Sequence, residues 1–339
     1  MLKINSEFFK CIEKIKNGVE YLKKINIIYE KEIEFKKKDT VFYYEPDIKK
    51  FEYIAAFDLD WTLTYNEKHL FPSDIDDIKI FPNRRKKLED IIKLGYTIVI
   101  FTNQQGKSKE EKQKKVERVK TFVKELKLPI FVYISTEKDN YRKPNIDMWN
   151  LFCKDKSVKN IVFAGDALGR PQDFSDSDKM FAESINATQI YSPEDFFGIA
   201  HIPSFKKTKE LVIFVGMPGS GKSTYYQNYL STHINIEQDL LKTRTKVMKE
   251  FDKALETGKS IVINATNPSQ EKRREYYEKA LKYNYNIKVL YFLVNGVGFN
   301  KLRNKPVPTI VYHKYFKDLR EGGGAPTFEN TPGEVFYVY

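Results

Sequence analysis

The chain has 339 residues, of which 41% are hydrophobic and 31% are charged. A chain of this length is long for one domain and accommodates two, each with a sizeable core. Lys and Arg number 58 against 46 Asp and Glu, which gives a formal net charge of +12. This excess favours a polyanionic partner such as nucleic acid, with a well-solvated, lysine-rich surface as the alternative.

Cysteine content and apolar run lengths argue against a secreted or membrane protein. Cys11 and Cys153 are too few and too far apart for a disulfide framework or a metal site. No apolar run reaches the roughly 18 residues of a spanning helix. The N-terminus carries Lys3, Glu7 and Lys10 among its apolar residues, which is unlike a signal peptide. We therefore expect an intracellular protein without membrane contact.

The first part of the chain divides into an extension and an α/β segment. Apolar residues recur at steps of three and four over 5–25, which predicts an amphipathic helix, and a densely charged connector follows. From about residue 51, the apolar runs "YIAAF", "YTIVIF", "IFVYI" and "IVFAG" alternate with helix-like stretches at 84–94 and 109–127. Alternating strands and helices predict a parallel sheet flanked by helices.

A second α/β series follows a boundary near 200–209, where prolines, a glycine and a basic cluster gather. The runs "LVIFVG", "HINIE", "SIVIN" and "NIKVLYFLV" predict strands, with helices from about 222, over 240–257 and over 269–283. The segment "REGGGAPTFENTPGE" predicts a loop. We interpret the chain as an extension (1–39) and two α/β domains (40–203 and 204–339), each a mainly parallel sheet flanked by helices.

The second domain opens with a phosphate-binding pattern. Residues 216–223, "GMPGSGKS", fit GxxxxGK[ST] between an apolar strand and a helix, which is the context that the pattern requires. Backbone N–H groups and the helix N-terminus favour phosphate there. Lys222 is expected to contact the β- and γ-phosphates of ATP, and Ser223 to bind Mg²⁺. The predicted nucleotide-binding residues are Gly216, Pro218, Gly219, Ser220, Gly221, Lys222, Ser223 and Thr224.

Two further segments fit phosphoryl transfer. Asp239 follows the strand "HINIE", roughly where an acceptor hydroxyl would meet the γ-phosphate. A carboxylate there can accept the hydroxyl proton, and a helix N-cap is its other role. Further on, "VGFNKLRNKPVPTIVY" offers Lys301, Arg303 and Lys305 as a lid over the phosphates, with a solvated basic helix as the alternative.

In the first domain, polar residues follow the predicted strands. Asp58 and Asp60 come directly after "YIAAF", at the carboxyl end where ligands bind in open α/β sheets. Like charges so close together cost energy unless a cation or a reaction uses them. The later strands deliver Thr102 and Asp166 in the same manner, and "NYRKPN" supplies Lys143.

Taken in order, these residues resemble the haloacid dehalogenase phosphohydrolases, which use D-x-D-x-T, a Ser or Thr, a Lys and a terminal acidic pair. The resemblance implies that Asp58 is the nucleophile that forms an aspartyl phosphate. It implies that Asp60 protonates the leaving alcohol and then activates water, while Thr102 and Lys143 hold the phosphoryl oxygens. Mg²⁺ would bridge the carboxylates and offset their repulsion.

The terminal acidic residue has several candidates. The segment "PQDFSDSDKMFAESI" offers Asp173, Asp176 and Asp178. Asp178 precedes a helical stretch, as in the family, and is favoured over Asp173. The implied metal ligands in this domain are Asp58, Asp60, Asp166 and Asp178.

A phosphatase followed by a P-loop kinase resembles the eukaryotic polynucleotide kinase 3′-phosphatases. The strings that carry this resemblance lie between about residues 40 and 320: "AAFDLDWTLT", "GYTIVIFTNQQG", "YRKPNIDMW", "FAGDALGRPQDFSDSDKMFA", "SPEDFF", "GMPGSGKST" and "ATNPS". The resemblance implies removal of a 3′-phosphate and ATP-dependent phosphorylation of a 5′-hydroxyl, which prepares strand breaks for ligation. Mg²⁺ and ATP are the implied cofactors. DNA ends are the implied partner, with RNA ends and a DNA ligase as further candidates, for a monomer in the nucleus, the cytoplasm or a viral factory.

Four features depart from the family pattern. Residues 1–39 do not resemble the forkhead-associated domain of animal members. Trp61 stands where D-x-D-x-T usually has Gly, and we expect it to reshape binding of the 3′ end. Asn264 in "VINATNP" replaces the usual Asp. The lid is shortened around 303–306, and Arg303 is expected to act as its arginine.

Two alternative functions stay open. Neither phosphate motif distinguishes ribose from deoxyribose, so repair of RNA ends is one alternative. Asn264 and the short lid favour another, a 3′-phosphatase and end-binding protein whose kinase half has decayed. The intact Lys222, Ser223 and Asp239 argue against that decay.

Overall fold

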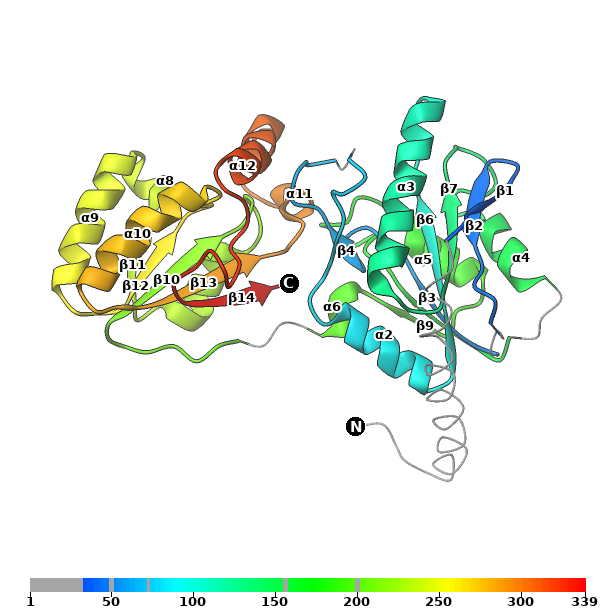
Figure 1. The fold of residues 1–339 in the computed structure, drawn as a ribbon, viewed down its shortest axis with the longest axis horizontal. Coiled ribbons are helices and arrows are strands. Elements are labelled where there is room, and N and C mark those ends of the chain that lie inside the picture. The colour runs from blue at the N-terminus through cyan, green and yellow to red at the C-terminus, as the bar shows by residue number, and fades with distance from the viewer. Residues whose placement is uncertain (1–32, 49–51, 72–73, 155–157, 199–201) are drawn as a thin grey trace, which may run out of the picture. The chain divides into compact units, whose positions relative to one another are not determined.

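The computed structural model describes residues 33–48, 52–71, 74–154, 158–198 and 202–339 (Figure 1). The helix predicted over 5–25 lies outside these residues. The chain divides into two compact units, Met1–Asn66 with Pro72–Gly198, and Glu67–Phe71 with Ile199–Tyr339. Among the described residues, no helix is both long enough and apolar enough to cross a membrane.

The first unit is built on a seven-stranded sheet with the order β1-β2-β7-β6-β3-β8-β9. Its strands are β1 (Lys36–Lys38), β2 (Val41–Tyr44), β3 (Tyr53–Phe57), β6 (Tyr96–Asn103), β7 (Ile130–Ser135), β8 (Asn160–Ala164) and β9 (Gln189–Tyr191). The five adjacent strands β7, β6, β3, β8 and β9 run parallel to one another. Beyond β7, β2 pairs antiparallel with β7, and β1 pairs antiparallel with β2. The sheet therefore includes residues before 40, which the sequence assigns to the extension. A small hairpin, β4 (Thr64–Tyr65) and β5 (Lys79–Ile80), follows β3.

Helices cover both faces of this sheet. One face packs against α2 (Arg84–Lys93), α3 (Lys109–Leu126) and α6 (Pro193–Phe197), and the other against α4 (Asp147–Cys153) and α5 (Ser177–Ser184). Because successive side chains of a strand point to opposite faces, Phe57 and Ile98 join the first cluster, whereas Ile54 and Phe101 join the second.

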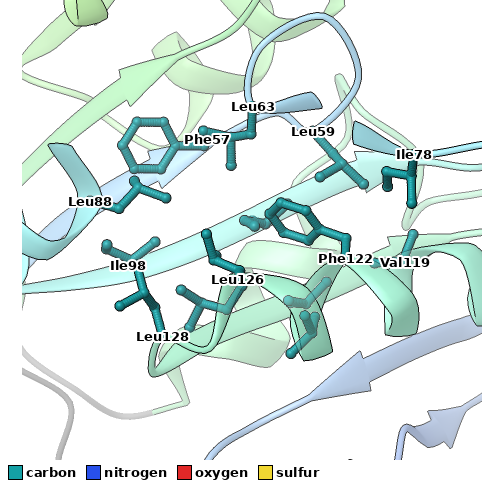
Figure 2. Packing of buried hydrophobic residues seen from close by; sticks show 14 of the residues in the cluster. Phe57, Leu59, Leu63, Ile78, Leu88, Ile98, Val119, Phe122, Leu126 and Leu128 are labelled. Atoms are coloured by element: carbon teal, nitrogen blue, oxygen red, sulfur yellow. The ribbon is translucent and has the colours of Figure 1, made fainter. Parts of the chain in front are cut away.

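The position of α3 matters for the site described below. Val119, Phe122 and Leu126 recur at helical spacing along α3 and are buried against the sheet (Figure 2). Ser108 caps the helix, since its hydroxyl accepts a hydrogen bond from the backbone N–H of Glu111. The same cluster contains the leucine that lies between the two aspartates of D-x-D-x-T. The core therefore fixes α3 beside that motif.

The second unit has a five-stranded, fully parallel sheet with the order β11-β12-β10-β13-β14. The strands are β10 (Glu210–Val215), β11 (Ile234–Glu237), β12 (Ile261–Asn264), β13 (Asn286–Phe292) and β14 (Glu334–Val338). The predicted fold class is confirmed, because both units are mainly parallel sheets flanked by helices. The sequence did not predict β14, which adds an edge after the predicted loop.

The helices of the second unit differ from the prediction at two points. They are α7 (Lys222–Tyr225), a π-helical turn (Tyr226–Leu230), α8 (Gln238–Leu241), α9 (Arg244–Glu256), α10 (Gln270–Lys282), α11 (Gly296–Asn300) and α12 (Thr309–Glu321). The single helix expected over 240–257 is two helices, because Lys242 has a left-handed backbone (φ 65°) and Thr243 caps α9. The sequence also did not predict α12 as a helix.

Candidate active sites

The strand order brings several predicted residues to one edge of the first sheet. β3 lies between β6 and β8, and all three run parallel. Their carboxyl ends therefore meet at the same edge, and they lead into Asp58, Thr102 and Asp166. Ligands bind at such edges in open α/β sheets. This edge is the candidate phosphatase site.

Lys143 links two of the aspartates at this site. Its ammonium nitrogen lies 2.6 Å from an oxygen of Asp58 and 2.6 Å from an oxygen of Asp178. The lysine side chain is buried, as a lysine rarely is without charged partners. Asn103, at the end of β6, holds the lysine backbone through two hydrogen bonds with the main chain of Lys143. The loop before α4 is thereby anchored to β6.

Asp178 is the terminal acidic residue that the geometry brings to the site. Its side chain is buried and accepts a hydrogen bond from the backbone N–H of Ala167. Gly165 makes this approach feasible, because an added Cβ there would lie 2.3 Å from an Asp178 oxygen. Asp173, the rejected candidate, instead pairs with Arg170 and accepts backbone hydrogen bonds of its own loop. It therefore stabilises the loop and lies outside the acidic group.

Three carboxylates lie close enough to hold one metal ion. Ligand oxygens of Asp58, Asp166 and Asp178 all lie within 4.8 Å of one another. Carboxylate oxygens are the donors that Mg²⁺ takes up, so this set fits that ion. The sequence predicts that the Asp60 carboxylate is also a metal ligand, but in the structure it lies outside this group of three carboxylates. Its oxygens accept hydrogen bonds from Arg118 and Gln104 instead.

Burial and neighbouring charges shift the pKa values at this site. Burial raises the pKa of Asp58 to about 7, although Lys143 acts in the opposite direction. The pKa of Asp166 is raised well above its ordinary value by burial and by the charges of Asp58 and Asp178. Burial alone would also raise the pKa of Asp60, but Arg118 and Gln104 outweigh it, so that pKa is lowered. The group therefore carries an excess of negative charge that a cation would offset.

Trp61 occupies a strained position beside the aspartates. Its backbone φ is 60°, in the left-handed region that costs an L-residue about 1–2 kcal/mol. The ring is half-buried, and its centroid lies 6.4 Å from that of Phe81. A glycine would adopt this backbone without strain. The predicted effect of Trp61 on the 3′ end stays a prediction.

The second candidate site is a pocket of about 930 Å³ above the carboxyl ends of the second sheet. Gly216 is not among the residues that line the pocket. The other seven predicted nucleotide-binding residues line it: Pro218, Gly219, Ser220, Gly221, Lys222, Ser223 and Thr224. Gly219 has a left-handed backbone (φ 78°), and a Cβ there would lie 2.4 Å from the carbonyl oxygen of Gly296. The loop can follow this path because position 219 is a glycine.

Lys222 is folded onto the loop that carries it. Its ammonium donates hydrogen bonds to the carbonyl oxygens of Gly216 (2.9 Å) and Met217 (2.7 Å) and to the Ser220 hydroxyl (3.2 Å). Burial lowers the pKa of Lys222 to about 7, with Asp239 acting to raise it and Arg303 to lower it. The negative charge of a bound polyphosphate would raise this pKa and favour the charged form of Lys222.

Asp239 and Arg303 both line the pocket with Lys222. Asp239 is exposed and lies in the first turn of α8, whose N-cap is Glu237 without a side-chain cap bond. The alternative role of Asp239 as an N-cap is therefore wrong. Asn264, at the end of β12, also lines the pocket, and its buried amide nitrogen has no hydrogen-bond partner within the described part of the chain. Lys301 and Lys305 are exposed and are not among the lining residues.

Sequence reasoning missed two residues at the first site. Gln104 follows Thr102 by two positions and therefore lies on the same side of the extended chain, which is a signal that was available. Arg118 is buried on a helix whose other basic residues are exposed or half-buried. Its spacing of four from Phe122 places it along the apolar face, and a charged residue there signals a buried partner.

Two family models match the chain. Residues 53–197 match "polynucleotide kinase 3 phosphatase", and residues 211–295 match "AAA domain". The first matched segment falls in the first unit except for Glu67–Phe71, and the second falls in the second unit.

Relatives with both halves match much of the chain. A bifunctional polynucleotide phosphatase/kinase of Schizosaccharomyces pombe is 33% identical over 278 residues, which cover 72% of this chain and 68% of that protein. A protein of Acanthamoeba polyphaga mimivirus assigned to the same bifunctional class is 31% identical and covers 68% of this chain and 70% of that one. A polynucleotide 3′-phosphatase of Arabidopsis thaliana is 31% identical over 187 residues, or 48% of this chain and 27% of that protein.

Proposed function

The chain belongs to the bifunctional polynucleotide phosphatase/kinase family, and from this membership we propose that it repairs the ends of broken nucleic-acid strands. It removes a 3′-phosphate and phosphorylates a 5′-hydroxyl with ATP. The observation that carries the proposal is the presence of two separate phosphate-handling sites, one at the β3 edge and one at the P-loop. The first site has Asp58 as nucleophile and Lys143 as the cation that contacts phosphate. The second has Asp239 as base and Lys222 as that cation.

In the phosphatase half, Asp58 attacks the phosphorus of the 3′-phosphate. A bond forms between its carboxylate oxygen and phosphorus, the bond from phosphorus to O3′ breaks, and Asp60 gives a proton to the leaving O3′. Water then attacks the aspartyl phosphate and gives a proton to Asp60, which frees Asp58 and inorganic phosphate. Thr102 and Lys143 hold the phosphoryl oxygens during both steps. These roles are assigned from the family resemblance and from the convergence of the side chains.

We propose that Mg²⁺ is the ion of this site. Asp58, Asp166 and Asp178 offer it oxygen ligands. When bound, the ion supplies charge that offsets the repulsion among the carboxylates and the phosphate. Asp60 is not proposed as a side-chain ligand, because its oxygens already accept hydrogen bonds from Arg118 and Gln104.

In the kinase half, Asp239 accepts the proton of the 5′-hydroxyl as that oxygen attacks the γ-phosphorus of ATP. The bond from the γ-phosphorus to the bridging oxygen breaks, and ADP leaves. Lys222 and the backbone N–H groups of residues 219–224 bind the phosphates, with Ser223 as the residue that would hold Mg²⁺. Arg303 stabilises charge that develops on the transferred group. The convergence of Lys222, Asp239 and Arg303 in one pocket supports these roles.

DNA ends are the proposed substrate. The net charge of +12 supports a polyanionic partner. A ligase is the class of enzyme that would use the product, since sealing requires a 5′-phosphate next to a 3′-hydroxyl. We propose that the protein acts as a monomer where such breaks arise, in the nucleus or the cytoplasm.

A single incubation tests both halves. The substrate is a nicked DNA duplex with a 3′-phosphate and a 5′-hydroxyl, supplied with Mg²⁺ and ATP. Omitting ATP should leave 3′ dephosphorylation intact and the 5′ end unchanged, whereas EDTA should stop both reactions. A matched RNA duplex measures the preference for ribose. Labelling of free nucleosides but of no oligonucleotide would contradict the proposal, and phosphatase activity without any 5′ labelling would show a decayed kinase.

A further inference from the structure

The carboxylate of Asp60 is held from two sides by residues of different elements. Arg118, on α3, donates to one oxygen at 2.7 Å. Gln104, just after β6, donates to the other oxygen at 2.6 Å. The Asp60 side chain still has an exposed fraction of 34%, so solvent reaches it. Asp60 is therefore fixed in direction yet open to water.

The position of Arg118 is set by the protein core. Only 2% of its side chain is exposed, and its Nε donates to the backbone carbonyl oxygen of Asp77 at 3.1 Å. The next residue on α3, Val119, packs into the core together with Phe122 (Figure 2). A buried guanidinium is costly without a negative partner, and the Asp60 carboxylate supplies it. The cation therefore has little freedom to move away from Asp60.

Gln104 links Asp60 to the predicted phosphate contact. The same amide nitrogen that donates to Asp60 also donates to the hydroxyl oxygen of Thr102 at 2.9 Å. An amide nitrogen has two hydrogens, which is enough for both partners. Because the Thr102 oxygen accepts here, its own hydrogen is left to donate to a phosphoryl oxygen. The amide thus fixes the distance between Asp60 and the group that Thr102 holds.

From this geometry we propose that Arg118 and Gln104 are positioning residues that hold Asp60 as the base for hydrolysis of the aspartyl phosphate. The proposal rests on the proposed phosphatase function and identifies the half-reaction that the two residues serve. In that step the water oxygen bonds to phosphorus, the bond from phosphorus to the Asp58 oxygen breaks, and the water proton goes to Asp60. Each oxygen of this carboxylate accepts one of the two hydrogen bonds and retains a lone pair that can take the proton from water.

The variants Arg118→Met and Gln104→Glu separate this role from a loss of folding. Arg118→Met keeps an unbranched apolar side chain about as long as the methylene stem of arginine and removes the charged guanidinium. Gln104→Glu keeps the shape and replaces the donor by an acceptor. Arg118→Lys retains a cation and is the rescue variant. Glu117→Gln, on the same helix, is the matched control, because Glu117 is half-buried and its carboxylate accepts a hydrogen bond from the exposed Gln113.

Pre-steady-state kinetics with 4-nitrophenyl phosphate distinguish the two steps. Nitrophenolate is a good leaving group that needs no proton, so phosphorylation of Asp58 does not depend on Asp60. We expect both variants to release about one nitrophenolate per chain at a rate close to wild type. The later steady-state kcat should fall by about 10²-fold, the usual size of a general-base effect, and KM should fall in proportion, because the unchanged phosphorylation step sets kcat/KM. Intact mass should show a phosphoryl group on the protein, and Arg118→Lys should recover much of the steady-state rate.

Three results would overturn the inference. One is an initial release that slows in proportion to the steady state. Another is a steady-state rate unchanged in both variants, and the third is a variant without accumulated phosphoprotein. A full burst amplitude shows that the site is folded, so slow turnover cannot then be ascribed to misfolding. A wild-type protein without activity on 4-nitrophenyl phosphate and on 3′-phosphorylated DNA would instead contradict the proposed function itself.

Discussion

Lys143 and Asp58 form a buried ion pair, with 2.6 Å between the ammonium nitrogen and a carboxylate oxygen. The lysine shares its charge with Asp178 at the same distance, so one cation serves two of the three clustered carboxylates. The pair ties the segment before α4 to the end of β3. It also aligns the predicted nucleophile with the predicted phosphate contact before any substrate is bound, which is the preorganisation that catalysis by charge requires.

Asp58→Ala is expected to abolish the 3′-phosphatase, with a loss of at least about 10³-fold, because a covalent nucleophile has no substitute. The kinase rate should stay within a few-fold of wild type. Release of phosphate from a 3′-phosphorylated oligonucleotide and 5′ labelling from ATP measure the two rates. Asp90→Asn, on the exposed side of α2, is the control. Substantial phosphatase activity in Asp58→Ala would contradict the covalent mechanism.

Lys222→Ala and Asp239→Asn should have the opposite pattern. The first removes the cation that stabilises the γ-phosphate, and the second removes the base for the 5′-hydroxyl. Both should stop 5′ phosphorylation and leave 3′ dephosphorylation intact. Asp252→Asn is the matched control, since Asp252 pairs with Lys279 on the surface of the second unit. A kinase rate unchanged by Asp239→Asn would remove that residue from the mechanism.

Arg303 should matter more than the other basic residues of its segment. It lines the pocket, and its positive charge lowers the pKa of Lys222, whereas Lys301 and Lys305 do not line the pocket. We expect Arg303→Ala to lower the kinase kcat by at least about 10²-fold, as removal of a charge-stabilising group does. Lys301→Ala and Lys305→Ala should change it by less than about 3-fold, apart from weaker DNA binding, whose difference from wild type should be largest at low salt. Equal effects of the three substitutions would indicate a diffuse basic surface.

Much of the fold was predictable because the central strands are continuous apolar runs. Strands such as β3 and β7 are buried on both faces in a parallel sheet, so their sequences are apolar throughout. The edge strands are short and carry little apolar signal: β1 ("KKK") is exposed along its length, and β9 ("QIY") is exposed or half-buried. The break between α8 and α9 was not predictable, because Lys242 adopts a left-handed backbone that its residue type does not favour.

From the residue pattern alone, the candidate site was predictable where chemistry follows a strand, whereas Lys143 and Asp178 were predicted from the family resemblance. Asp58, Thr102 and Asp166 come directly after apolar runs, so topology alone brings them together. Arg118 differs, because it contacts Asp60 across 58 positions of sequence. That contact depends on how α3 packs on the sheet, and no local pattern specifies it.

Asp166→Asn is expected to stabilise the metal-free first unit. Burial and the charges of Asp58 and Asp178 raise the pKa of Asp166 well above 3.8, so its charged form is disfavoured in the folded state. The resulting loss of folding free energy is absent at low pH, where Asp166 is protonated in both the folded and the unfolded state. It grows as the pH rises above the unfolded pKa and levels off above the folded one. An asparagine never carries the charge, so the variant should avoid the penalty at every pH.

Thermal unfolding in EDTA between pH 4 and pH 8 tests this expectation. The midpoint of Asp166→Asn should exceed that of wild type by an amount that is small near pH 4 and increases with pH. Adding Mg²⁺ at pH 8 should raise the wild-type midpoint, because an ion that binds only the folded state stabilises it. The variant lacks one of the three carboxylates and should respond much less. Asp147→Asn, at the start of α4 and outside the acidic group, should follow wild type in both buffers. A difference between Asp166→Asn and wild type that shrinks as the pH rises would contradict the raised pKa, and an equal response to Mg²⁺ would remove Asp166 from the metal site.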